Sequence, residues 1–207
     1  MKTFFRFLPI LFLAVAITAC DSNSSNDDEN LELNVTTVTE LAADPFVGFV
    51  NGQPVGSGRY TFYSLRENKV VAAGDSATTK WDIALRGTTL LVNGGTSGPG
   101  VGQAQVVEGL FEELVEAPVG GWKADAAGSP AITVGSGKGW YNYSPSTMTI
   151  TPIPGRVIFV QTADGKYAKV RILNYYKGQP ATPTQDSEAR YFTFEYVIQP
   201  DGSRELL

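Results

Sequence analysis

The 207-residue sequence contains no histidine, one cysteine and two methionines. Without histidine, the chain lacks Ser-His and Cys-His nucleophile pairs, His-liganded zinc, and any side chain that titrates near neutral pH without help from its surroundings. Most hydrolases and metalloenzymes are thereby excluded. An enzyme built on carboxylates alone would need a pair such as Asp82 with Glu67 or Asp164, and no spacing in the sequence supports one. We therefore expect neither an enzyme nor a metal site, and we interpret Asp82 as a surface or turn-bonding acid.

The single cysteine stands at the end of a short apolar run. Lys2 and Arg6 make the N-terminus positive, and the apolar run, broken by Pro9, is too short for a convincing transmembrane span. It ends in Ile17-Thr18-Ala19-Cys20, which resembles the lipobox of bacterial lipoproteins. We therefore predict a signal peptide over residues 1–19 and lipid attachment, including palmitate, at Cys20. Such an anchor holds a protein on a membrane surface without spanning it. We expect that membrane to be the outer membrane, with the protein at the cell surface.

The segment after the cysteine is acidic. Loss of Lys2 and Arg6 with the signal peptide lowers the net charge from −5 to −7. Residues 20–32 contain five acids and no base, among serines and asparagines, which is typical of a solvated, flexible tether. No basic stripe indicates nucleic acid binding, so we expect none.

From about residue 31, apolar and polar residues alternate in short runs, as in strands with one buried face. These runs lie at 31–35, 60–63, 81–85, 140–143, 148–151, 168–172 and 192–198. Turn-forming stretches separate them, at Asn51-Gly52, 152–155, 163–165 and 180–183. The pattern predicts an all-β or mainly β fold of the sandwich type, as a single domain over residues 33–207.

Two stretches depart from this pattern. The pattern of apolar residues predicts one short helix over Glu108–Ala117, because Leu110, Phe111 and Leu114 would share a face and Pro118 would end it. The glycine-rich run at 93–102 is interpreted as a loop that needs unusual backbone angles. Because that run lacks the Gly-Lys-Ser/Thr ending of a phosphate-binding loop, it does not indicate nucleotide binding.

Three segments carry a family resemblance: Trp81–Leu85 with the glycine run at 93–102, then Gly139–Ser144, then Arg156–Val170. In order and spacing they resemble the HmuY family of haem-capturing surface lipoproteins from Gram-negative bacteria. The resemblance covers roughly residues 60–198. It implies a largely β fold, haem as the cofactor, and an outer-membrane haem uptake system as a partner.

The same resemblance raises a problem of iron ligation. Well-known members hold the iron between two histidines or two methionines, whereas this chain has no histidine and would keep one methionine after processing. Pro145 stands where the resemblance places a histidine in some members. Haem bound by this chain would therefore be held more weakly or by different ligands.

The nearest soft ligand is Met148, with Tyr141, Tyr143 and Lys138 as alternatives. Met148 alternates in phase with Ile150, so a core position between the sheets is the commoner outcome for it. Alternation also predicts Trp140 on one face of the sheet and both tyrosines on the other.

Two functions remain open from the sequence. The first is a tethered module that binds haem or a related tetrapyrrole for uptake. The second is a lipoprotein of the same fold that binds no haem and serves as an envelope interaction or adhesion component. The missing pair of ligands favours the second, and the family resemblance favours the first.

Overall fold

The computed structural model describes residues 1, 33–51 and 53–207. The lipid-attachment site predicted at Cys20, the tether predicted over 20–32 and nearly all of the signal peptide predicted over 1–19 lie outside these residues. The described chain is built mainly of antiparallel strands. The strands are β1 (Thr36–Ala42), β2 (Phe46–Val50), β3 (Gln53–Gly56), β4 (Thr61–Ser64), β5 (Lys69–Val71), β6 (Ile83–Arg86), β7 (Thr89–Val92), β8 (Gln103–Glu108), β9 (Tyr141–Ser144), β10 (Thr149–Pro152), β11 (Arg156–Gln161), β12 (Tyr167–Tyr176) and β13 (Ala189–Ile198).

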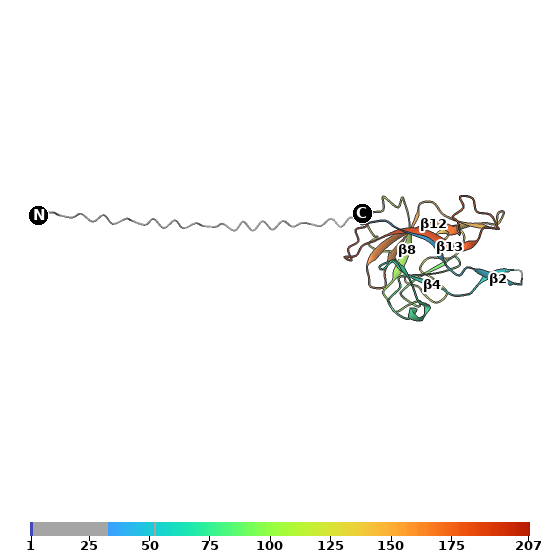
Figure 1. Cartoon of the computed structure of the whole chain (residues 1–207), viewed down its shortest axis with the longest axis horizontal. Coiled ribbons are helices and arrows are strands. Elements are labelled where there is room, and N and C mark those ends of the chain that lie inside the picture. The colour runs from blue at the N-terminus through green and yellow to red at the C-terminus, as the bar shows by residue number, and fades with distance from the viewer. Residues whose placement is uncertain (2–32, 52) are drawn as a thin grey trace. The chain divides into compact units, whose positions relative to one another are not determined.

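A five-stranded sheet has the order β1-β13-β12-β11-β8. Its two longest strands, β12 and β13, lie side by side near its centre (Figure 1). The first strand pairs with the last, since Thr36 lies opposite Tyr196 and Ala42 opposite Tyr191. The strand predicted at 31–35 is displaced: β1 begins at Thr36, Val35 is exposed, and Leu31 lies outside the described residues.

A four-stranded sheet has the order β5-β4-β6-β7. Apolar side chains of both sheets share one core, in which the rings of Tyr63 (β4) and Phe194 (β13) meet edge to face at 5.7 Å between centroids. The alternation in both strands explains this core, because every second side chain faces the opposite sheet. The predicted mainly β sandwich fold is confirmed.

Each sheet also buries part of its outer face. Val157 and Phe159 of β11 pack on the far side of the five-stranded sheet with Phe111 and Leu206. Since β11 is covered on both faces, its four central residues are all buried and show no alternation in burial. On the outer face of the four-stranded sheet, Trp81 forms a smaller apolar cluster.

The helix predicted at Glu108–Ala117 is wrong. Glu108 ends β8, and the next residues form a single turn in which Leu114 N–H donates to Leu110 C=O. Lys169 of β12 is buried and donates from Nζ to the carbonyls of Phe111 (2.8 Å) and Leu114 (3.2 Å), which holds this turn against the sheet. Leu110 is exposed while Phe111 is buried, so the expected apolar face does not form.

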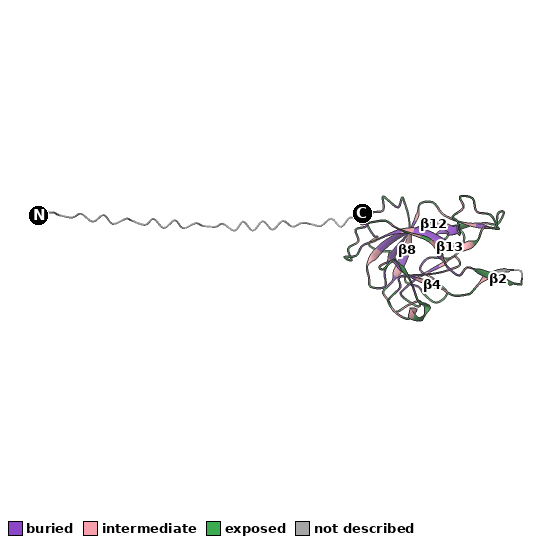
Figure 2. Ribbon diagram, in the orientation of Figure 1, coloured by how far each residue is buried: buried purple, intermediate pink, exposed green. Residues whose placement is uncertain are grey.

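The described residues contain one short 3₁₀ helix, Ala73–Asp75, and none of their helices is long and apolar enough to cross a membrane. The hairpin of β2 and β3 projects from the sandwich (Figure 1). Its β2 strand is largely exposed, unlike the buried strands of the core (Figure 2). Phe46 and Phe49 of β2 are both exposed, and their rings pack on each other at 5.1 Å.

Candidate functional site

The candidate haem ligands gather on the hairpin of β9 and β10. Ser144 pairs with Thr149 at its closed end, and Tyr141 pairs with Pro152 at its open end. The turn at 145–148 is held by hydroxyl groups, since Thr147 Oγ1 donates to Ser144 Oγ at 2.8 Å and lies 2.7 Å from Thr149 Oγ1. The turn therefore has a defined shape and presents its last residue, Met148, next to β10.

Met148 does not occupy the core. Met148 is 58% exposed, and its φ of +52° lies in the left-handed region, which residues other than glycine and asparagine seldom adopt. This backbone conformation interrupts the alternation between Met148 and Ile150, so only Ile150 packs against the core. The expectation of a core methionine is wrong, and the thioether faces solvent, where a ligand can reach it.

Tyr141 is buried and its hydroxyl already has partners. It accepts hydrogen bonds from Gly135 N–H at 3.1 Å and Thr88 Oγ1 at 3.3 Å. Trp140, expected on the opposite face, is buried too, and its ring lies 5.0 Å from that of Tyr141. That expectation fails because β9 begins at Tyr141, so Trp140 precedes the strand and is not bound by its alternation.

Tyr143 and Lys138 are both exposed. Tyr143 lies one residue from the closed end of β9, and its backbone N–H donates to Ser136 Oγ at 2.8 Å. The hairpin thus carries two exposed groups able to bind iron, Met148 and Tyr143, and one buried tyrosine whose hydroxyl is satisfied. Lys138 lies outside the hairpin, in the turn that precedes β9.

Asp82 is not a surface acid, because its side chain is completely buried. The other half of the interpretation holds: Asp82 bonds a turn, accepting from the N–H groups of Leu65 (2.8 Å) and Arg66 (3.3 Å). It also accepts from Arg66 Nε at 2.9 Å and from Ala163 N–H at 3.1 Å. This carboxylate ties the β4–β5 turn to the β11–β12 turn and has no free oxygen with which to act on a substrate.

The glycine-rich run is packed tightly around Asn93, which is buried. Asn93 Nδ2 donates to the carbonyls of Thr78 and Trp81, each at 2.8 Å, and its Oδ1 accepts from Gly100 N–H at 3.0 Å. A Cβ on Gly94 would lie 2.0 Å from the carbonyl oxygen of Gly102. Within the run only Gly95 has a positive φ, +59°. Most of these glycines are therefore required for space and not for backbone angle, which the sequence pattern could not distinguish.

Across residues 33–51 and 53–207, no three His, Cys, Asp or Glu side chains gather into a group that could hold a metal ion. Iron brought in as haem would therefore depend on single side chains such as Met148. Thioether sulfur can bind haem iron, so Met148 is the side chain of this hairpin that could hold such a group. Apart from Met148, the chain after Met1 has no methionine, and it has no histidine, that could serve as a second ligand.

Several solved structures are similar to this chain. They include an apo HmuY analogue from Tannerella forsythia (16% identity, 81% of this chain and 96% of that chain, TM-score 0.45). A Bacteroides fragilis protein assigned as a lipoprotein (16%, 82% and 91%, 0.47) and a Bacteroides vulgatus protein assigned as HmuY-like and haem-binding (19%, 82% and 93%, 0.46) are similar too.

A comparison with curated proteins finds no match. The family model described as HmuY protein, in contrast, matches residues 58–196, which is well over half of the chain. The match includes all three segments that carried the resemblance, from Trp81 to Val170. This chain belongs to the HmuY family.

Proposed function

We propose that this protein is a lipid-anchored member of the HmuY family that binds haem or a related tetrapyrrole at the β9–β10 hairpin and passes it to an outer-membrane uptake system. The observation that carries the proposal is the exposed thioether of Met148 at the closed end of that hairpin. Family membership supports haem as the ligand class. The sequence Ile17-Thr18-Ala19-Cys20 supports processing at residue 19 and anchoring through Cys20.

In this proposal Met148 would bind the haem iron. A second ligand would come from the exposed Tyr143 phenol of the same chain or from Met148 of a second copy, since the mature chain would contain no other methionine and no histidine. Tyr141 would not serve as a ligand, because it is buried in the core and its hydroxyl is engaged by Gly135 and Thr88. Bound haem would supply its iron and its flat apolar ring, and the chain's own part is to hold and orient it.

Titration of residues 33–207 with haemin, followed at the Soret band, tests this. We expect a saturable shift that is lost or displaced in Met148→Ala. Met148→Leu keeps an apolar side chain of similar size but removes the sulfur, so loss of the shift in this variant as well assigns the effect to the thioether. A stoichiometry of one haem per chain supports Tyr143 as the second ligand, and one per two chains supports a shared site. Absence of a saturable shift, or a shift unchanged by both variants, would overturn haem ligation by Met148.

The anchor has a separate test. Cys20→Ala in the full chain should leave the protein soluble after cell fractionation, while Cys20 protein labelled with a palmitate analogue should partition with outer membranes. A Cys20→Ala protein that stays with the membranes would overturn lipid anchoring without bearing on haem. Protease shaving of intact cells then distinguishes the outer from the inner face of that membrane.

A second function is favoured by a different feature, the exposed apolar strand β2 with Phe46 and Phe49. In that case the protein acts as an envelope interaction or adhesion component and binds no haem. Exposed aromatic side chains in a cluster are typical of surfaces that contact other proteins. A chain that fails the haemin titration but loses an envelope partner in Phe46→Ser, Phe49→Ser would establish this alternative.

A further inference from the structure

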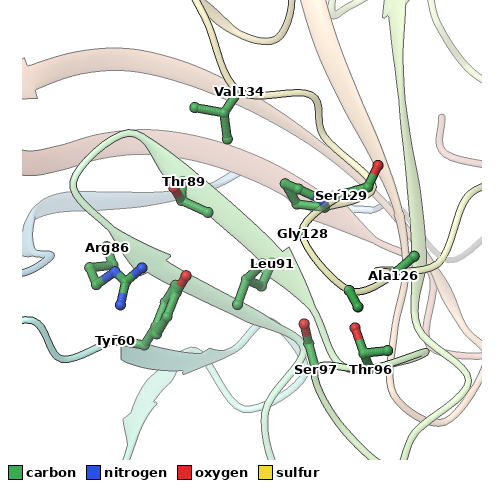
Figure 3. Close-up of a pocket in the computed structure, with 12 residues that line it drawn as sticks. Tyr60, Arg86, Thr89, Leu91, Thr96, Ser97, Ala126, Gly128, Ser129 and Val134 are labelled. Carbon is green, nitrogen blue, oxygen red and sulfur yellow. The ribbon is translucent and has the colours of Figure 1, made fainter.

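A pocket of about 320 Å³ lies on the outer face of the four-stranded sheet, away from the β9–β10 turn. Its floor comes from β6 and β7, where Arg86 pairs with Thr89 and Ala84 with Leu91. Figure 3 shows Tyr60 and Arg86 on one side of the pocket, Thr96 and Ser97 on another, and Leu91 between them. The loop at 126–130 forms the remaining wall.

The pocket is positively charged within an acidic protein. Arg86 is the charged residue among those that line it, and no lining residue is acidic. The guanidinium stacks on the Tyr60 ring at 4.3 Å and donates to Gly58 C=O at 3.3 Å. In the part of the chain that the structure describes, no carboxylate forms an ion pair with Arg86, although most of the other arginines there have one. Its remaining N–H groups are therefore available to an anion.

The wall opposite Arg86 is held in place by a buried acid. Asp125 accepts from Val92 N–H at 2.9 Å and from Ala131 N–H at 2.7 Å, which fixes the 126–131 loop to β7. Ala126 and Ser129 exchange two backbone hydrogen bonds of 2.9 Å each, and Thr96 N–H donates to Asp125 C=O at 2.9 Å. These hydrogen bonds hold the pocket in shape without a ligand, so the entropic cost of ordering it on binding is small.

The lining sets the chemical class of the ligand. A guanidinium fits a carboxylate with two parallel hydrogen bonds. The hydroxyls of Thr89, Thr96 and Ser97 can bond to hydroxyl groups, and Leu91 and Val134 can cover a face made of C–H groups. A volume of 320 Å³ is near the lower end for ligand pockets and suits one six-membered ring rather than a macrocycle.

We propose that this pocket binds a single hydroxylated organic acid of the sugar-acid class, with its carboxylate on Arg86. The site is separate from the proposed haem site and does not depend on it. The probe is D-glucuronate, titrated into residues 33–207 by calorimetry and by saturation-transfer NMR. D-glucose, which lacks the carboxylate, and acetate, which lacks the ring, serve as ligand controls.

Arg86→Gln should weaken glucuronate binding about tenfold or more, because it removes a charge-assisted hydrogen bond. Arg59→Gln, at an exposed arginine outside the pocket, is the matched control and should leave binding unchanged. Ala127→Phe fills the pocket from an exposed position and should abolish binding without affecting folding, which keeps the test valid if Arg86→Gln unfolds. Circular dichroism and thermal melting check each variant.

Three results would overturn the proposal. The first is no glucuronate binding up to about 10 mM, which corresponds to less than about 3 kcal/mol. The second is binding of glucose or acetate as tight as that of glucuronate. Equal binding of glucose would show that the carboxylate is not recognised, and equal binding of acetate would show that the ring is not. The third is binding that Ala127→Phe leaves intact, which would place the ligand elsewhere.

Discussion

Arg66 donates from Nε to the fully buried Asp82 at 2.9 Å and lies 3.4 Å from Asp164 through Nη1. One arginine thus joins an acid at the start of β6 to an acid in the β11–β12 turn, across the two sheets of the sandwich. Asp82 also accepts from backbone N–H groups of the β4–β5 turn and of the β11–β12 turn. The carboxylate and Arg66 therefore hold these two turns together. Asp82 and Asp164 thus share one arginine and hold the turns that surround it.

Removal of the buried carboxylate should destabilise the fold strongly. Asp82→Ala leaves Arg66 and three backbone N–H groups without their acceptor. We expect a loss of about 3–5 kcal/mol in the free energy of unfolding, as for other broken buried pairs. Asp75→Ala, which breaks the more exposed pair with Lys80, should cost less than about 1 kcal/mol. Urea unfolding measures both, and similar losses in the two variants would contradict the assignment.

The glycine run should be intolerant of a single methyl group. In Gly94→Ala the new Cβ would lie 2.0 Å from Gly102 O, a backbone atom that cannot move aside cheaply. We expect destabilisation of about 2–3 kcal/mol. The control is Gly74→Ala, where a Cβ meets nothing within 4 Å and where stability should stay the same or rise by up to about 1 kcal/mol. Thermal melts of the pair would refute steric packing if Gly94→Ala melted at the wild-type temperature.

Lys169 should hold the turn that replaces the expected helix. Lys169→Met keeps the length of the side chain but leaves the carbonyls of Phe111 and Leu114 without their donor. We expect a loss of about 1–3 kcal/mol and faster amide exchange over residues 110–115. Lys177→Met, at an exposed lysine paired with Glu188, is the control and should change neither. Exchange that is unchanged in Lys169→Met would show that the turn forms without this lysine.

Asp164 should make part of the stability depend on pH. Partial burial raises the pKa of its carboxyl, but the hydrogen bond from Thr162 and the charges of Arg66 and Lys166 outweigh it, so the pKa lies below its usual 3.8. A carboxyl with a lowered folded-state pKa stabilises the fold above its unfolded-state pKa. This contribution is lost as the pH falls below about 3.8 through the folded-state value. Asp164→Asn should therefore flatten the acid side of the stability curve, measured by urea unfolding at a series of pH values, and an unchanged slope would contradict this.

The sequence was sufficient for the strands that alternate clearly, but not for short or doubly covered strands such as β5 and β11, nor for the turns between strands. The alternation of Phe192, Phe194 and Tyr196 predicts β13 because a strand's burial depends on its own period of two. The turn found in place of the helix at 108–117 is held by Lys169, which is distant in sequence. The core position expected for Met148 was wrong because its positive φ interrupts the alternation of the strand, and the pattern of apolar residues does not reveal the sign of φ.

The candidate sites divide in the same way. Met148, Tyr141 and Tyr143 were predicted as candidates because they lie close together in sequence, and the structure places them on one hairpin, with Tyr141 at its open end and Met148 in its turn. The pocket at Arg86 was not predicted, since its walls come from β6, β7, the residue before β4 and loops that meet only in the folded chain. An arginine at a strand end with no nearby acid is a weak local signal, and its ring partner Tyr60 lies 26 residues earlier in the chain, just before β4.

The pairing of β1 with β13 has a consequence for how the molecule is made. The strand formed first during synthesis can be completed only by one of the last, because Thr36–Ala42 waits for Tyr191–Tyr196. Pairings so distant in sequence form slowly, and until then the edge of β1 is open to wrong partners.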